Sequence, residues 1–119
     1  MEQRELAIIV VEDDKLVRET LAMVLEEAEI PVVQCENAEA ALRVLAKQAD
    51  HVGMLIIDIK LDGKIDGLEL ANFVRLSYPE IQLVVTSGVA PAQLPDSATF
   101  VPKPWRREDM LRQARRVLH

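Results

Sequence analysis

Five residues with carboxylate, hydroxyl or ammonium side chains follow four separate apolar runs of the sequence. Two acids come after residues 6–11, a third after residues 54–57, a hydroxyl after residues 81–85 and an ammonium after residues 98–101. If these runs are parallel strands of one sheet, their carboxyl ends share one edge, where ligands of open α/β folds bind. The residues that would meet there are Glu12, Asp13, Asp58, Thr86 and Lys103.

Such a cluster is suited to a divalent cation and a phosphoryl group. Three carboxylates within a few ångströms raise each other's pKa unless a cation screens them. Oxygen ligands with positions left open for water favour Mg²⁺ over Zn²⁺. Beside the ion, the Asp58 carboxylate could act as a nucleophile and form an aspartyl phosphate. Lys103 and the Thr86 hydroxyl would complete the shell around the new oxygens.

The elements that must position these residues alternate between short β-branched runs and stretches of helical period. This alternation is typical of βαβ units around a parallel sheet. Residues 6–11 are apolar throughout, as expected of a central strand. Residues 15–28 have the spacing of an amphipathic helix with Asp14 as its cap, and residues 31–35 indicate an edge strand because Pro31 cannot donate to a ladder.

The second half of the chain repeats this alternation. Asn37 is expected to cap a second helix, and Asp66 a third helix that ends at Ser77, with Glu69 placed as the acid of a capping box. A last helix is expected to run to the terminus, because acids precede arginines in the order that favours a helix dipole. The remaining strands are expected at residues 54–58, 81–86 and 98–101.

The segment between Thr86 and Lys103 is short for a strand, helix and strand. Pro91 and Pro95 flank only three residues, and a proline within a helix removes a hydrogen bond. We therefore expect a loop or a single helical turn at residues 89–96, and a helix there that is shortened or absent.

Length and composition limit the class of protein. The 119 residues, half of them apolar, indicate one domain over residues 1–119 with no output domain. The net charge of -6 disfavours nucleic acid and anionic membranes as partners. Neither a membrane span nor a signal peptide is evident, so a cytoplasmic location is expected. Cys35, the single cysteine, is expected to be a reduced and at least half-buried thiol.

Four motifs together resemble the receiver domain of two-component response regulators. They are the acid pair Glu12 and Asp13, the acceptor Asp58 after three apolar residues, Thr86 before Ser87 and Gly88, and Lys103 before Pro104. The resemblance covers essentially the whole chain. It implies a five-stranded, doubly wound, flavodoxin-like parallel sheet of order 2-1-3-4-5.

The resemblance also implies a role for each residue. Asp58 would be the phosphoacceptor and a metal ligand, Asp13 a direct ligand, Glu12 a ligand through water, and the backbone carbonyl of Lys60 a further ligand, with Mg²⁺ as the cofactor. Thr86 would bond the phosphoryl group and Lys103 would pair with it. Phe100 would change rotamer when Thr86 moves inward, and the peptide bond between Lys103 and Pro104 would be cis.

One departure from the family lies in the loop after Asp58. The family usually places a proline four residues on, in a loop one residue shorter, whereas this chain has Asp62 followed by Gly63. We expect a variant turn there that leaves the Lys60 carbonyl in place.

The expected function is a phosphorelay switch. Asp58 would accept a phosphoryl group from a sensor histidine kinase or a histidine phosphotransfer protein, and the change would alter binding to a downstream protein that the sequence does not identify. His51 has no second histidine or cysteine nearby and is expected to be a loop residue, so the donor histidine belongs to the partner. The chain is not expected to be an enzyme beyond phosphorylating and dephosphorylating itself at Asp58.

Two alternatives stay open. A receiver that is never phosphorylated could serve as a protein-binding scaffold, although the complete set of acids, Thr86 and Lys103 argues against it. A small phosphohydrolase with an aspartate nucleophile would have a second acid two residues after the first, where this chain has Lys60.

Overall fold

A five-stranded parallel sheet with strand order β2-β1-β3-β4-β5 forms the centre of the protein. The computed structural model describes residues 6–117. The sheet confirms the predicted flavodoxin-like order and places the second strand at an edge, as the proline before it predicted. The strands are β1 (Ala7–Val11), β2 (Val32–Cys35), β3 (Val52–Asp58), β4 (Gln82–Ser87) and β5 (Thr99–Pro102).

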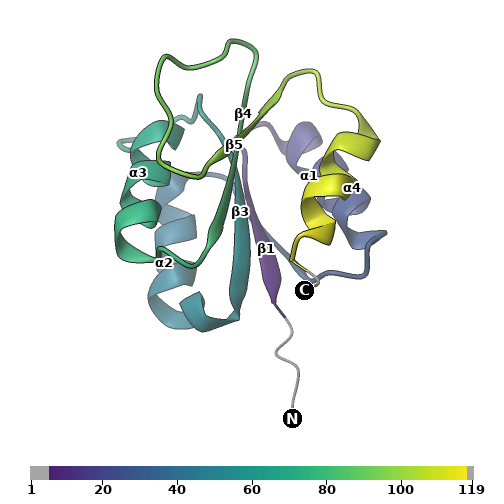
Figure 1. Ribbon diagram of the computed structural model, residues 1–119, viewed down its shortest axis with the longest axis horizontal. Helices are drawn as coiled ribbons and strands as arrows, with labels where there is room; N and C mark the ends of the chain where they lie inside the picture. The colour runs from purple at the N-terminus through teal and green to yellow at the C-terminus, as the bar shows by residue number, and fades with distance from the viewer. Residues whose placement is uncertain (1–5, 118–119) are drawn as a thin grey trace.

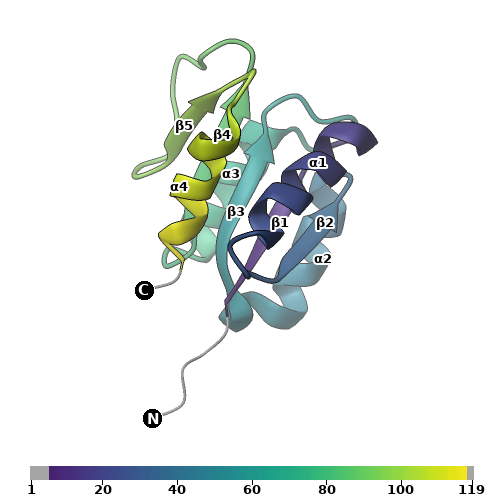
Figure 2. The same ribbon diagram turned by 90° about the vertical axis from the view of Figure 1, so that its right-hand side faces the viewer.

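Helices cover both faces of this sheet. In Figure 1, α2 and α3 lie on one side of the strands and α1 and α4 on the other, and Figure 2 shows α1 and α4 in front of the sheet. A short 3₁₀ turn, Ala49–His51, connects α2 to β3. The helices are α1 (Lys15–Glu26), α2 (Ala38–Gln48), α3 (Gly67–Ser77) and α4 (Arg107–Arg115).

The central strands bury side chains on both faces. Along β1, Ile9 and Val11 pack into the core under α2 and α3, whereas Ile8 and Val10 pack into the core under α1 and α4. Every residue of β3 is buried as well. A strand buried on both faces has no polar face, which explains the unbroken apolar runs that predicted it.

Three of the helices begin at the predicted caps. The Asp14 carboxylate accepts from the Val17 amide at 3.1 Å. The Asn37 side chain accepts from the Ala40 amide at 2.8 Å. At α3, Asp66 forms a reciprocal capping box with its third helical residue, as predicted from the spacing. These caps satisfy amides that have no partner within the helix.

Several element boundaries differ from the predicted ones. α1 ends at Glu26, two residues before its predicted end, where the chain turns through Glu29 at a φ of 61°. β3 starts two residues earlier than predicted, and β4 and β5 are each shifted one residue towards the carboxyl end. Pairing with neighbouring strands sets where each strand starts and ends. The apolar character of a run does not show this pairing. α4 ends at Arg115 and residues 116–117 form a turn, so the prediction that the last helix continues to the terminus is wrong; the charge order indicates a helix but not where it stops.

Residues 88–98, between β4 and β5, contain no helix, which confirms the prediction for this segment. In Figure 1 the segment forms the loop at the top of the molecule. Its end is held by Arg75 of α3, whose Nε donates to the Asp96 carbonyl at 2.8 Å. The same guanidinium also donates to the carbonyls of Pro79 and Ile81, at 3.0 and 3.2 Å. α3 therefore anchors the segment through the Asp96 carbonyl, and the other two bonds hold the connection between α3 and β4.

The structure also bears on the expected state of Cys35 and on the expectation of no membrane span. Cys35 is buried and has no disulfide partner, and burial raises the pKa of its thiol. Within residues 6–117, no helix is long and apolar enough to cross a membrane.

Candidate functional site

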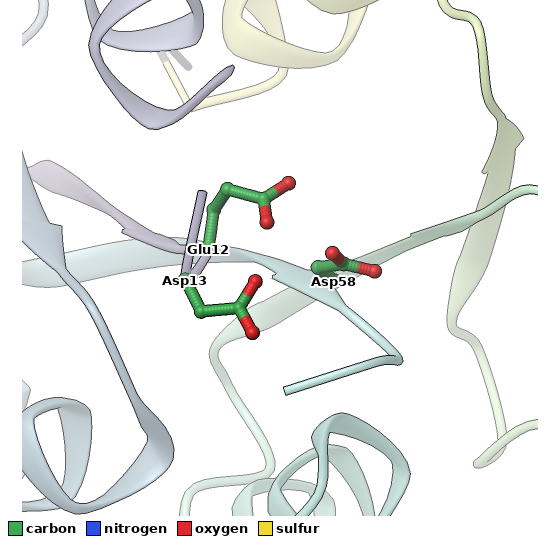
Figure 3. Close-up of side chains that lie close together, drawn as sticks. All are labelled: Glu12, Asp13 and Asp58. Carbon is green, nitrogen blue, oxygen red and sulfur yellow. The ribbon is translucent and has the colours of Figure 1, made fainter. Parts of the chain in front are cut away.

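Strand pairing brings the predicted acids together at the carboxyl edge of the sheet. Val11 is paired with Ile57, so the residues that follow them, Glu12 and Asp58, are neighbours. Asp58 is also paired directly with Thr86. Figure 3 shows the carboxylates of Glu12, Asp13 and Asp58 close together at the strand ends.

The three carboxylates fit a magnesium ion. Each offers one oxygen, and the three oxygens lie within 4.8 Å of one another. Glu12 and Asp58 are buried, whereas Asp13 is half-exposed at the side open to solvent. Ligands that are all oxygen, with one side left for water, match the coordination that magnesium prefers. Asp13, Asp58 and, through water, Glu12 are the groups that would hold it.

Lys103, which directly follows β5, forms hydrogen bonds with two of these acids. Its ammonium donates to Glu12 Oε1 at 2.8 Å and to Asp58 Oδ2 at 3.0 Å. Burial acts to lower the pKa of Lys103, but the hydrogen bonds to the two carboxylates outweigh it and the pKa is raised. Lys103 is therefore held in its charged form beside Asp58. The peptide bond between Lys103 and Pro104 is cis, as predicted.

Glu12 is the acid whose proton affinity the fold changes most clearly. Burial raises its pKa to about 7; the Lys103 hydrogen bond opposes this rise, and the nearby Asp58 adds to it. The Asp14 amide donates to Glu12 Oε2 at 3.2 Å. With no ion bound, the Glu12 carboxyl is therefore expected to titrate near neutral pH.

Thr86, which is paired with Asp58 across the sheet, carries a buried hydroxyl. The residue is 3% exposed, and its Oγ1 has no hydrogen-bond partner among residues 6–117. A buried hydroxyl without a partner is unfavourable by about 1–3 kcal/mol, so it is available for a ligand that supplies an acceptor or donor.

Phe100 lies in β5, paired with Val85, one residue before the partner of Thr86. Its side chain is half-buried. The switch role of Phe100 stays a prediction.

Backbone groups of the loop after β3 also reach the acids. The Lys60 amide donates to Asp58 Oδ1 at 3.1 Å, and the Asp62 amide donates to Asp13 Oδ2 at the same distance. The ligand role of the Lys60 carbonyl stays a prediction. The role of the Asp62 amide is not predictable from the sequence, because a backbone donor leaves no side-chain signal.

A second contact that the sequence does not predict comes from α1. Arg18 Nη1 donates to the backbone carbonyl of Glu12 at 2.8 Å. This bond joins the first helix to the turn that carries the acid pair. Its only sequence signal was an arginine four residues after the Asp14 cap, which is common in helices.

The sequence matches the response regulator receiver domain family over residues 8–115. The chain belongs to this family, and the sheet order and the acid cluster agree with it. Among curated relatives, it is 30% identical over 115 residues to the heme response regulator HssR of Staphylococcus aureus, covering 92% of this chain and 50% of that protein. It is 29% identical over 110 residues to the response regulator protein FleR of Pseudomonas aeruginosa, covering 87% of this chain and 23% of that protein. The chain thus spans half or less of the length of these relatives.

Solved receiver domains have the same fold. A response regulator receiver domain protein from Clostridium thermocellum has a TM-score of 0.85 at 16% identity, covering 95% of this chain and 94% of that one. The receiver domain of NtrX from Brucella abortus has a TM-score of 0.80 at 25% identity, covering 93% and 97%. The first of these likenesses supports the fold alone.

Proposed function

We propose that this receiver domain is a magnesium-dependent phosphoacceptor switch with Asp58 as the acceptor. The single observation that carries the proposal is the position of Lys103, whose ammonium bonds both Glu12 and Asp58. A scaffold would gain little from placing a lysine and three acids at one edge, because buried charges are costly unless they are paired. The same arrangement provides the charges that a phosphoryl group needs.

The proposed chemistry follows from the positions of the side chains. An Asp58 oxygen attacks the phosphorus atom, and an O–P bond forms as the P–N bond of a phosphohistidine breaks. The electron pair of that bond leaves with the imidazole nitrogen of the partner, which takes up a proton from water. Bound magnesium would neutralise charge on the phosphoryl oxygens.

Two neighbouring groups would hold the phosphoryl group on Asp58. Lys103 is within reach of the carboxylate and can move its bond from Asp58 to a phosphoryl oxygen. The Thr86 hydroxyl, which lacks a partner in the described part of the chain, can bond another oxygen. Together they would draw β4 and β5 towards the modified aspartate, and a shift between two conformations would alter the surface offered to a downstream protein.

The phosphoryl donor in this proposal is a sensor histidine kinase or a histidine phosphotransfer protein. The family assignment supports a signalling partner of this kind. Activity of the domain by itself would be limited to taking up and releasing the phosphoryl group at Asp58.

Intact-mass spectrometry tests the proposal directly. The protein is incubated with magnesium chloride and a small-molecule phosphodonor such as acetyl phosphate, and its mass is recorded over time. We expect a single added phosphoryl group that is absent without magnesium and absent in Asp58→Asn. A matched control is Asp50→Asn, which changes an exposed acid at the opposite end of β3.

The alternatives give different results in the same assay. A non-phosphorylated scaffold would show no adduct under any condition, and that outcome would overturn the proposal. A phosphohydrolase would release inorganic phosphate continuously from acetyl phosphate, with many turnovers for each Asp58. For a switch we expect phosphate release limited by slow loss of the adduct.

A further inference from the structure

The side chain of Asp13 is held by the loop that follows β3. The Asp62 amide donates to Asp13 Oδ2 at 3.1 Å, which joins two positions 49 residues apart in sequence. Among residues 6–117, no other hydrogen bond to this carboxylate is found. Asp13 is half-exposed, so packing restrains it less than it restrains Glu12 or Asp58. The orientation of the Asp13 carboxylate therefore depends on where this loop places one amide.

The loop reaches Asp13 because of a turn that only glycine adopts easily. Gly63 has a φ of 117°, in a region that side chains rarely enter. A Cβ at this position would also lie 3.2 Å from Oε2 of Glu39, a residue in the first turn of α2. The Glu39 carboxylate thus fills the space that a side chain at position 63 would need. Asp62, whose amide bonds Asp13, comes directly before this glycine.

The two ends of the loop are also set by close contacts. Near its start, the Lys60 amide bonds Asp58. At its end, the Gly67 amide donates to the Ile59 carbonyl at 3.0 Å, and a Cβ on Gly67 would lie 2.0 Å from the Asp58 carbonyl oxygen. Because both ends are tied to the end of β3, the conformation at Gly63 decides where the Asp62 amide lies.

We propose that the Asp62 backbone amide, placed by the Gly63 turn, is a positioning group for the metal ligand Asp13. It orients one carboxylate oxygen and leaves the other for the ion, which lowers the entropy that the side chain loses when metal binds. This inference rests on the proposed function, because it takes Asp13 as a magnesium ligand. A proline at position 62 could not donate this bond, because proline has no backbone N–H.

Two substitutions at one position separate the amide from the side chain. Asp62→Pro removes the N–H and the carboxylate, whereas Asp62→Ala removes only the carboxylate. Magnesium affinity is measured by isothermal titration calorimetry, and the melting temperature is measured in EDTA. We expect Asp62→Pro to bind magnesium about tenfold more weakly than Asp62→Ala, as is typical when a group that orients a ligand is lost. Equal affinities within twofold would overturn the inference.

A glycine pair provides a second test that does not depend on proline being accommodated. Gly63→Ala keeps every donor but opposes the turn, whereas Gly88→Ala introduces a Cβ that meets no atom of residues 6–117 within 4 Å. We expect magnesium affinity to fall about tenfold in Gly63→Ala and to stay within twofold of wild type in Gly88→Ala. A Gly63→Ala variant that binds magnesium as wild type does would contradict the proposal, whatever its melting temperature.

Amide hydrogen exchange measured by NMR tests the bond itself in metal-free protein. We expect Asp13→Ala to speed exchange of the Asp62 amide and to leave the Lys60 amide, which bonds Asp58, unchanged. Unchanged exchange at Asp62 would overturn the inference.

These readouts separate the inference from the proposed function. A wild-type protein that binds magnesium but takes up no phosphoryl group would overturn the function alone, and the affinities would still decide the role of Asp62. A wild-type protein that does not bind magnesium would overturn both.

Discussion

Asp58 and Thr86 are paired directly across strands β3 and β4, so the two residues are neighbours at the same sheet edge, and the buried Thr86 hydroxyl has no hydrogen-bond partner among residues 6–117. This register holds the backbones of the two residues side by side through the hydrogen bonds of two buried strands. Any phosphoryl group on Asp58 would therefore form next to a residue whose hydroxyl has no competing partner in the described part of the chain.

Replacing Thr86 by valine is expected to have opposite effects on stability and on phosphorylation. Thr86→Val removes a buried hydroxyl that makes no hydrogen bond to any of residues 6–117, so the free energy of unfolding in urea should stay the same or rise by about 1 kcal/mol. The rate of phosphorylation by acetyl phosphate should fall about tenfold, the equivalent of one hydrogen bond. A clear loss of stability would indicate that the hydroxyl already has a partner in the folded protein.

Replacing Lys103 by methionine is expected to slow phosphorylation strongly. Lys103→Met removes the ammonium that bonds Glu12 and Asp58 but keeps much of the side-chain volume. We expect the rate of adduct formation, followed by intact mass, to fall about 100-fold, as when one preorganised donor is lost from an active site. Lys47→Met, on the exposed surface of α2, is the matched control and should react as wild type does.

The raised pKa of Glu12 predicts how stability depends on pH without metal. Its folded-state value of about 7 lies above the ordinary 4.5, so the folded state binds this proton more tightly than the unfolded state. The contribution of Glu12 to stability is therefore fully present below pH 4.5 and is lost as the pH rises through 7. Urea unfolding in EDTA at several pH values should show this decline, and Glu12→Gln should remove the part that Glu12 contributes.

Magnesium binding is expected to have the opposite pH dependence. The ion favours deprotonated Glu12, so binding must displace a proton when the pH is below 7. The magnesium dissociation constant should rise by up to about tenfold between pH 8 and pH 6. Calorimetry in buffers of different ionisation enthalpy would measure the released proton, and affinity that does not change with pH would contradict this assignment.

Replacing Arg75 is expected to release the segment between β4 and β5. The guanidinium donates to three carbonyls, including that of Asp96, and Arg75→Met removes all three bonds. We expect amide exchange in residues 94–98 to become faster and stability to fall by about 1–3 kcal/mol. Arg115→Met, on the exposed surface of α4, should leave both unchanged. A protected helix of three turns at residues 89–96 in wild type would contradict the described structure of this segment.

The parts of the fold that could be predicted from the sequence are those with a local cause. Unbroken apolar runs identified the central strands because a strand buried on both faces has no polar positions. Asn37 and Asp66 identified helix starts because their side chains bond amides three residues away. Pro91 and Pro95 predicted that residues 89–96 form no full helix, because a proline within a helix removes a backbone hydrogen bond. Strand ends were less accurate, because partners distant in sequence set them.

The sequence by itself determined which chemical groups stand at the strand ends, and therefore that Glu12, Asp13, Asp58, Thr86 and Lys103 meet at one edge. Only the tertiary structure decided how they interact. The bonds from Lys103 to two acids and from the Asp62 amide to Asp13 join residues far apart in the chain. The burial that raises the pKa of Glu12 also comes from the packing of distant elements. Such contacts depend on backbone position and solvent exclusion, which no local pattern of residue types records.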